Sequence, residues 1–352
     1  MKVGIMTWFY GHNYGAQLHS YALQQTVLGL GHECVMISFY PHNLAKKNIL
    51  MNLNYKDRKK HPCLAMRCLK RNLNFYRNRN ALFNQSQRVH TASEIDALEC
   101  DIIILGSDEV FKISHPYFDP LFYGVGIKTP CIAYAPSAGQ TDSATELPDS
   151  IKTALNKIRA LSVRDSYTRA LIQSNTGINA TVVLDPTLLY DFQGFSNEFP
   201  EKDYILVYSF DTLDEYRSRI QEYASEHALS IICVGRYCKW ANNSYDSVGV
   251  KDWVGAFEKA SVVVTDSFHG TVFAIKNRKP FIVVGRSDKL NKIDALLNDA
   301  GIVRPYYDGS ISVEQYLADR IDYVDVNKRL DTKKSESLSF LKEALSNVEG
   351  DL

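Results

Sequence analysis

Residues 261–275 place an apolar, β-branched run directly before a polar turn and a second apolar stretch at helical spacing. This order predicts a buried strand, a turn and a helix. In an open α/β sheet, ligands bind at the carboxyl ends of the strands, and the amides that open the next helix favour an anion. His269, which exchanges protons near neutral pH, stands in this turn. The segment therefore predicts either a ligand site or an ordinary strand–turn–helix with a hydrogen-bonded histidine.

Strands and helices alternate in two series on either side of a polar loop at 191–203. The expected strands are 2–8, 33–39, 101–105, 131–135, 161–163 and 181–184, then 204–210, 230–235, 261–265 and 281–285. A chain of 352 residues is long for one core. We therefore expect an α/β protein of two doubly wound, Rossmann-like domains facing a cleft, over residues 1–195 and 196–352. A final helix at 332–348 is expected to pack back on the first domain.

Residues 42–91 interrupt this alternation with a basic segment. It holds twelve lysines and arginines, opposed only by Asp57, and apolar residues are interleaved among them. We expect an inserted basic helical element. One interpretation is a solvated helical face over a small local core. The other is a surface that docks anionic lipid head groups or a diphosphate carrier.

Charge, hydropathy and cysteine content narrow the class of protein. The formal net charge is zero, which gives no electrostatic basis for binding nucleic acid. No apolar run is long enough to span a membrane, and no signal peptide is visible. The seven cysteines include no CxxC pair, and four of them lie in or beside strand-like apolar runs. This pattern predicts free thiols in a reducing, cytoplasmic compartment and argues against a disulfide framework or a zinc site.

Polar residues that follow the first-domain strands are the candidates for ligand contact. Asn13 and Gln17 offer neutral donors between the first strand and helix, although a small-residue helix start also serves packing. The glycine spacing there is not that of a dinucleotide site. After the strand at 101–105, a carboxylate of Asp108 or Glu109 could orient or deprotonate a sugar hydroxyl. The alternative for Ser107 or Asp108 is a helix N-cap.

Two arginines follow strands and are candidate anion ligands. Arg164 could bind a phosphate or a carboxylate with its planar guanidinium, or it could pair with the adjacent Asp165 or another neighbour. Arg286 follows the strand at 281–285. The turn at Asp185 is read as structural. No nucleophile elbow, Walker glycine loop or HExxH motif occurs, and nothing has the spacing of metal ligands.

Six short pieces, in order over about residues 1–300, together resemble the polysaccharide pyruvyl transferase family. They are Asn13-Tyr14-Gly15-Ala16, Gly106-Ser107-Asp108-Glu109-Val110-Phe111, Ala133-Tyr134-Ala135-Pro136-Ser137-Ala138-Gly139, Ser162-Val163-Arg164-Asp165, Asp185-Pro186-Thr187-Leu188-Leu189, and Thr265-Asp266-Ser267-Phe268-His269-Gly270-Thr271. The family more often has Gln and Trp where this chain has Glu109 and Phe111.

The resemblance implies a two-domain fold similar to that of GT-B glycosyltransferases. It implies transfer of a pyruvyl group from phosphoenolpyruvate to two hydroxyls of a hexose, with release of phosphate. The acceptor would belong to a capsular or exopolysaccharide repeat, carried on a polyprenyl diphosphate at the inner face of the plasma membrane. No metal or other cofactor is implied, because helix N-termini and arginines can hold the donor's two anionic groups.

The resemblance also assigns roles to the candidate residues. His269 would be the general acid or base, or the donor to the leaving phosphate, and Asp108 and Glu109 would act on acceptor hydroxyls. The remaining assignments are donor contacts at Arg164, Ser267, Gly270, Thr271 and Arg286, and acceptor contacts at Asn13, Tyr14, Gln17 and Ser107. Two alternatives stay open: a nucleotide-sugar glycosyltransferase of the same architecture, and a non-catalytic scaffold of a polysaccharide assembly complex.

Overall fold

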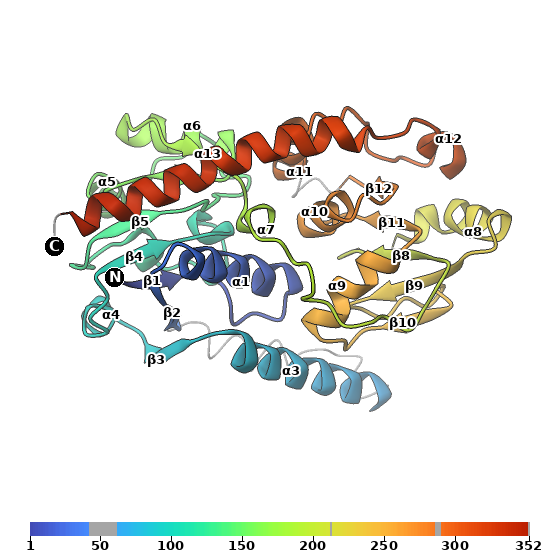
Figure 1. The fold of residues 1–352 in the computed structure, drawn as a ribbon, viewed down its shortest axis with the longest axis horizontal. Coiled ribbons are helices and arrows are strands. Elements are labelled where there is room, and N and C mark those ends of the chain that lie inside the picture. Colours follow the sequence, from blue (N-terminus) through green and yellow to red (C-terminus); the bar gives the residue numbers. More distant parts are fainter. Residues whose placement is uncertain (42–61, 212, 286–289, 351–352) are drawn as a thin grey trace. The chain divides into compact units, whose positions relative to one another are not determined.

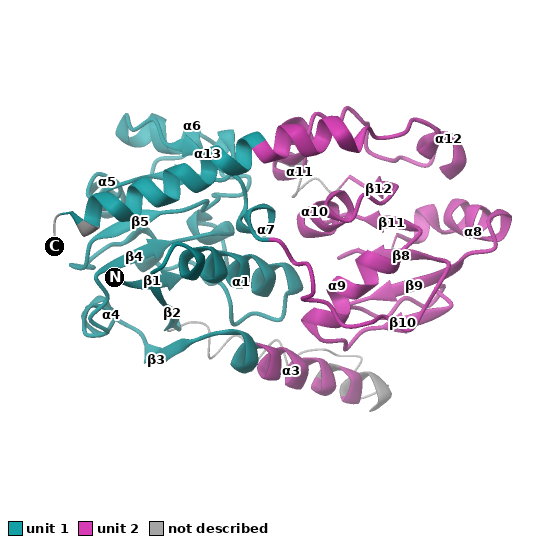
Figure 2. Ribbon diagram, in the orientation of Figure 1, with its two compact units in different colours: residues 1–62, 79–190, 332–352 teal, residues 63–78, 191–331 magenta. Residues whose placement is uncertain are grey.

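The computed structural model describes residues 1–41, 62–211, 213–285 and 290–350. The chain forms two compact units, coloured separately in Figure 2. Unit 1 comprises Met1–Pro62, Arg79–Tyr190 and Thr332–Leu352, and unit 2 comprises Cys63–Asn78 and Asp191–Asp331. Unit 1 is thus made of three separate stretches of the chain and unit 2 of two, so the chain passes between the units four times.

Unit 1 is built on a parallel sheet in the order β3-β2-β1-β4-β5 (Figure 1). Its strands are β1 (Lys2–Met6), β2 (Glu33–Phe39), β3 (Gln85–Val89), β4 (Ile102–Leu105) and β5 (Cys131–Ala133). A bridge from Ala133 to Leu161 leads on to the short parallel pair β6 (Ser162–Val163) and β7 (Thr181–Val182). Strand addition changes direction between β1 and β4, which makes their carboxyl ends the switch point of this sheet.

Unit 2 repeats the topology with the order β10-β9-β8-β11-β12. Its strands are β8 (Tyr204–Tyr208), β9 (Ser230–Val234), β10 (Asn243–Tyr245), β11 (Val262–Thr265) and β12 (Phe281–Val283), all paired in parallel. Each sheet thus has the Rossmann order 3-2-1-4-5 when its strands are counted from the start of its own unit. The switch point of unit 2 lies between β8 and β11.

Helices flank both sheets. Those of unit 1 are α1 (Tyr14–Gly29), α4 (Ala92–Asp96), α5 (Asp149–Leu155), α6 (Ser166–Thr176) and α7 (Pro186–Leu189). Those of unit 2 are α8 (Arg217–Glu226), α9 (Val250–Lys259), α10 (Phe268–Lys276), α11 (Leu290–Asp299) and α12 (Val313–Ala318). Helices α3 (Pro62–Leu82) and α13 (Tyr323–Glu349) contribute residues to both units.

The predicted α/β class of two Rossmann-like domains is confirmed. The central strands were found because each is an apolar run that is buried on both faces, as β4 and β11 are. That the two domains face one cleft stays a prediction. The structural division falls after Tyr190, whereas the prediction had placed it after residue 195, and the part of α13 from Thr332 onward belongs to unit 1. There, Leu184 N donates to Ser337 Oγ (3.0 Å).

The expectation for residues 42–91 is partly corrected. Residues 42–61 lie outside the described part of the chain, and α3 is helical as expected. Gln85–Val89, however, is strand β3, which pairs with β2 at the edge of the sheet. Only Val89 of this strand is buried. An edge strand of this kind carries no apolar run and therefore gives no strand signal in the sequence.

Candidate functional site

Asp108 is presented by a turn at the carboxyl end of β4, at the switch point of unit 1. Gly106 has φ 112°. A Cβ at that position would lie 2.4 Å from the carbonyl oxygen of Tyr134, so only glycine fits. Asp108 itself has φ 71°, in the left-handed region that aspartate tolerates better than most residues. The turn thereby directs one carboxylate out of the strand end.

Two basic side chains flank the Asp108 carboxylate on opposite oxygens. Oδ1 lies 3.5 Å from Nη1 of Arg164, and Oδ2 lies 3.5 Å from Nε2 of His19. The other ring nitrogen of His19, Nδ1, shares a hydrogen bond with Oγ of Ser107 (2.7 Å). His19 is fully buried in α1, and Asp108 keeps 17% of its side chain exposed. Asp108 is therefore held in place from inside the protein and remains open to a ligand.

Arg164 is fixed by a second, fully buried carboxylate. Its Nη1 donates to Asp185 Oδ2 at 2.9 Å. The other oxygen, Asp185 Oδ1, accepts from N (3.0 Å) and Oγ1 (2.6 Å) of Thr187 at the start of α7. Burial lowers the pKa of Arg164, but the charges of Asp185, Asp108 and Asp165 outweigh this and raise it. Arg164 is thus a permanent, pre-oriented cation beside Asp108.

The hydrogen bonds that hold the Asp165 carboxylate come from residues other than Arg164. Asp165 caps α6 by accepting from Thr168 N (2.7 Å), and its other oxygen accepts from Ser137 Oγ (2.7 Å). Asp185 was predicted to have a structural role. In the structure, its carboxylate also positions the guanidinium of Arg164.

The other predicted residues of unit 1 have local roles in the fold. Asn13 caps α1, accepting from Ala16 N at 3.3 Å. Tyr14 and Gln17 are buried in α1, and Glu109 lies 3.7 Å from Lys112. Ser107 is buried as well, on His19. Sugar contacts by these residues, and a catalytic role for Glu109, stay predictions.

In unit 2, Asp266 joins the loops that follow the two strands at the switch point. Asp266 is fully buried at the end of β11. Its carboxylate accepts from Phe210 N (2.8 Å) and Asp211 N (3.0 Å), in the loop after β8. The two strand ends are therefore held at a fixed separation, next to the N-terminus of α10.

Ser267, Gly270 and Thr271 form the N-terminal turn of α10. Ser267 is the N-cap, and its Oγ accepts from Gly270 N at 2.9 Å. Its carbonyl oxygen accepts from Thr271 N (3.0 Å) and Thr271 Oγ1 (3.0 Å). The amides of Gly270 and Thr271 were expected to cradle a phosphate, but in this structure they are bonded within the turn. Donor contacts of the three residues stay predictions.

His269 is the second residue of α10. It lies two residues after the N-cap Ser267 and is 9% exposed, with its ring edge-on to that of Phe268 at 5.1 Å. The turn that holds it is tight: a Cβ at Gly270 would lie 2.1 Å from Thr265 Oγ1. His269 is thus a proton-exchanging group beside the positive end of a helix dipole. Arg286 lies outside the described residues.

A small cavity of about 170 Å³ opens at the carboxyl ends of β8 and β9. Its lining includes Asp211, Arg236 and Lys239. Arg236 Nη1 donates to the carbonyl oxygen of Ser209 (3.4 Å), which places the guanidinium in the loop that Asp266 also holds. These two basic residues are candidate anion ligands on the same edge of the sheet as His269.

Several residues of the site were not predicted from the sequence, among them Arg236, Asp266 and His19. Arg236 follows the predicted strand at 230–235, so the criterion that selected Arg286 would also have selected it. Asp266 stood in the best motif but was passed over in favour of its neighbours. His19 gave no signal, because it lies in mid-helix and meets Ser107 only through the fold.

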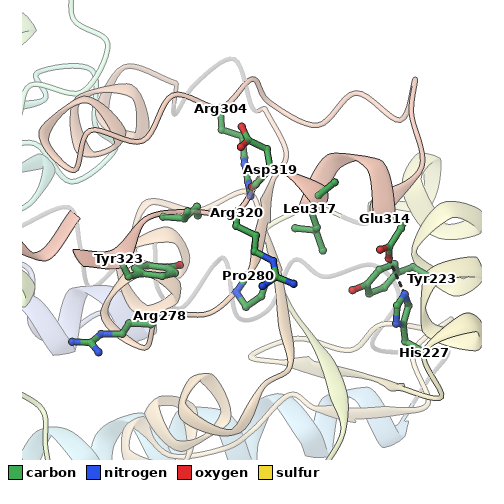
Figure 3. Close-up of a pocket in the computed structure, with 12 residues that line it drawn as sticks. Tyr223, His227, Arg278, Pro280, Arg304, Glu314, Leu317, Asp319, Arg320 and Tyr323 are labelled. Atoms are coloured by element: carbon green, nitrogen blue, oxygen red, sulfur yellow. Dashed lines mark hydrogen bonds and ion pairs between the residues drawn. The ribbon is translucent and has the colours of Figure 1, made fainter. Parts of the chain in front are cut away.

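A larger cavity of about 490 Å³ lies elsewhere in unit 2 (Figure 3). It opens at the amino end of β12, next to Pro280, and is therefore on the sheet edge opposite to His269. Its wall is rich in arginine, and Figure 3 shows His227 joined to Glu314, at 2.8 Å.

The arginines of this cavity have a structural explanation. Helices α8, α10 and α12 all end at it, and helix C-termini carry partial negative charge that arginine complements. Arg304 also donates to the carbonyl oxygens of Phe281 (3.2 Å) and Asp319. We therefore assign this cavity no part in the site.

Among the described residues, no three His, Cys, Asp or Glu side chains converge to hold a metal ion. None of the helices in the described ranges is both long and apolar enough to cross a bilayer.

Each unit is a Rossmann-like α/β domain with charged side chains at its switch point, and two such domains are typical of GT-B-like proteins. The family model of polysaccharide pyruvyl transferase matches residues 13–288. The chain belongs to this family, and the resemblance predicted from its six motifs is confirmed. No sequence match was found among curated proteins.

Solved structures similar to this chain share its fold at low sequence identity. UDP-GlcNAc 2-epimerase from Neisseria meningitidis is 10% identical, with a TM-score of 0.53 over 99% of this chain and 100% of that one. MnaA of S. aureus is 11% identical, with a TM-score of 0.51 over 96% and 91% of the two chains. The glycosyltransferase of kitacinnamycin is 11% identical, with a TM-score of 0.52 over 99% and 98%. These likenesses establish the GT-B-like fold alone.

Proposed function

We propose that this chain transfers the pyruvyl group of phosphoenolpyruvate to two hydroxyls of a hexose, forming a cyclic ketal and releasing phosphate. The family match over residues 13–288 supports pyruvyl transfer. The observation that carries the mechanism is the pairing of Asp108 with Arg164, 3.5 Å apart at the switch point of unit 1. A carboxylate that can take a proton thus lies beside a fixed cation that can hold an anionic donor.

The reaction needs protons to be moved in both directions. A proton adds to the methylene carbon of phosphoenolpyruvate while one sugar hydroxyl attacks the adjacent carbon and loses its own proton. The phosphate then leaves with the electrons of its C–O bond, and the second hydroxyl attacks the same carbon and loses a proton. General acid–base groups can move these protons, and cationic side chains can stabilise the departing phosphate. We therefore propose a reaction without a metal or a further cofactor.

Asp108 is the group that we propose takes the proton from an acceptor hydroxyl. It has one oxygen toward Arg164 and the other toward His19, and part of its side chain is exposed. Arg164 would hold the carboxylate of the donor beside the sugar, because its ion pair with Asp185 fixes the orientation of the guanidinium. The contact between Asp108 and Arg164 supports this proposal that acceptor and donor meet here.

His269 is the group that we propose supplies a proton to the methylene carbon or to the departing phosphate. The N-terminus of α10 favours negative charge at this position, and Arg236 and Lys239 add positive charge on the same sheet edge. We propose that unit 2 binds the phosphate in this way and that unit 1 binds the sugar.

The acceptor is proposed from the family and is a hexose of a capsular or exopolysaccharide repeat unit on a polyprenyl diphosphate. Such an acceptor is presented at the inner face of the plasma membrane, which is where we propose the enzyme works.

The direct test is phosphate release from phosphoenolpyruvate with a panel of lipid-linked and simple hexosides. We expect phosphate release only with an acceptor that has two free hydroxyls close enough to be joined in one ketal ring. The variants Asp108→Asn and Arg164→Met should each lower turnover by about 100-fold or more while the chain stays folded. The exposed-surface variant Lys157→Gln is the matched control and should retain full turnover.

The main alternative is a nucleotide-sugar glycosyltransferase. It would be favoured if a nucleotide sugar, and not phosphoenolpyruvate, raised the melting temperature of the protein. Phosphoenolpyruvate that raises the melting temperature and is turned over contradicts it.

A further inference from the structure

Helix α3 carries a row of apolar side chains that are largely exposed. Met66, Leu69, Leu73 and Tyr76 are 71%, 59%, 46% and 54% exposed, respectively. They follow one another at spacings of three, four and three residues. Since a helix turns about 100° per residue, these four side chains form a single stripe on one face. A stripe of this kind is ordinarily buried.

The opposite face of α3 holds the helix to unit 2, partly through polar contacts. Arg67 pairs with Asp246 (3.5 Å), Arg71 Nη1 donates to the carbonyl oxygen of Gly235 (3.5 Å), and Asn74 donates to that of Ser247. Figure 2 shows this stretch of α3 coloured with unit 2. The rotation of the helix is therefore fixed by specific contacts, and these contacts turn its apolar stripe outward.

Positive charge accompanies the stripe. The sequence of α3 contains five arginines and lysines and no acidic residue. Lys70 and Arg77 fall beside the stripe on the helical wheel and are exposed. Neither forms an ion pair with any residue in the described ranges. The outward face thus combines exposed apolar side chains with exposed cations.

We propose that this face of α3 docks on a membrane surface that contains anionic lipids. Leu and Tyr side chains on an isolated helix enter the boundary between head groups and acyl chains, while flanking Lys and Arg bind anionic head groups. A single stripe on a convex helix forms no groove for a partner's side chains. A fluid lipid layer can accommodate such a surface without a groove. Two copies of this chain meeting through α3 would instead bring Lys70 and Arg77 against the same residues of the other copy, which opposes a dimer.

The stripe, from Met66 to Tyr76, is about 15 Å long and would lie in the plane of the interface. Because the other face of α3 is bound to unit 2, docking needs no rearrangement of the helix. The docking is independent of pyruvyl transfer and would hold for any activity of the chain.

The experiment is co-sedimentation of the full chain with vesicles of phosphatidylglycerol and phosphatidylcholine, against vesicles of phosphatidylcholine alone. We expect binding to the anionic vesicles, weakened by salt. The variants Leu69→Gln/Leu73→Gln and Lys70→Gln/Arg77→Gln should each weaken binding by about tenfold or more. Their melting temperatures and phosphate release with a soluble acceptor should stay at the wild-type level.

Matched controls come from exposed residues of the same kinds outside α3. Val303→Gln/Val324→Gln replaces two side chains that are 94% and 80% exposed, and Lys128→Gln/Lys157→Gln removes two exposed charges. Both controls should bind vesicles as the wild type does. Equal losses in the control and α3 variants, or equal binding to neutral and anionic vesicles, would overturn the proposal. So would concentration-dependent dimers that only the α3 variants lose, together with no vesicle binding, because the stripe would then join two copies.

Discussion

The stability of unit 1 should depend strongly on the buried ion pair between Arg164 and Asp185. Both side chains are almost completely buried, and Arg164 Nη1 lies 2.9 Å from Asp185 Oδ2. Asp185→Asn keeps an oxygen that can accept from Thr187 at the start of α7 but removes the negative charge. Arg164 is then left as a buried cation with only Asp108, 3.5 Å away, to offset it.

Removing one partner of a buried pair costs about 3–5 kcal/mol in the free energy of unfolding. The remaining interaction with Asp108 and the retained helix cap place Asp185→Asn at the lower end, about 3 kcal/mol. For a domain of about 150–250 residues, 1 kcal/mol shifts the melting temperature by about 2–4 °C. The melting temperature should therefore fall by about 6–12 °C, which calorimetry of the purified variant measures.

The double variant Arg164→Met/Asp185→Asn separates the buried charge from other effects. Since it removes both charges together, it should be more stable than the sum of the two single losses predicts. A fall of less than about 3 °C for Asp185→Asn, or strictly additive losses in the double variant, would refute the reasoning.

The remaining predictions concern unit 2. His269→Asn should lower phosphate release by about 100-fold or more, while phosphoenolpyruvate still raises the melting temperature; near-normal release would remove His269 from the mechanism. Gly270→Ala should cost about 1–3 kcal/mol in urea unfolding, because its Cβ would lie 2.1 Å from Thr265 Oγ1, and an unchanged midpoint would contradict this. A hydrogen bond from Cys233, helped by backbone amides, holds the pKa of the Cys238 thiol below its ordinary value. Because this thiol ionises at a lower pH in the folded protein than in the unfolded one, its ionisation stabilises the fold as the pH rises. The free energy of unfolding of the wild type relative to Cys238→Ser, measured by urea titration, should therefore increase from neutral pH to about 8.5. A difference that does not change with pH would contradict this prediction.

The sequence was sufficient for the central strands and for the helices that cover them. Strand β2 has the predicted bounds, because its apolar run reports burial directly. The edge strands β3 and β10 were not predicted. Edge strands face solvent and pair on one side only, so their polar sequences resemble loops.

The site was predictable where position along the chain decides it and not where side chains converge. Asp108, Arg164 and His269 follow strands, and the carboxyl ends of parallel strands form one edge. The contact of His19 with Asp108 joins residues that are far apart in sequence, and only the packing of α1 against the sheet creates it. For the amides of Gly270 and Thr271 the motif was identified from the sequence, but their hydrogen-bond partners were not. In the structure both amides donate to Ser267 within the same turn.

The most direct test of the central claim is the mass of the sugar after incubation with phosphoenolpyruvate and this protein. A pyruvate ketal replaces two hydroxyl hydrogens, so the acceptor should gain about 70 mass units, with one phosphate released for each sugar modified. The His269→Asn protein should yield little of this product in the same time. An acceptor of unchanged mass with phosphoenolpyruvate, and a gain of a whole hexose from a nucleotide sugar, would contradict the account.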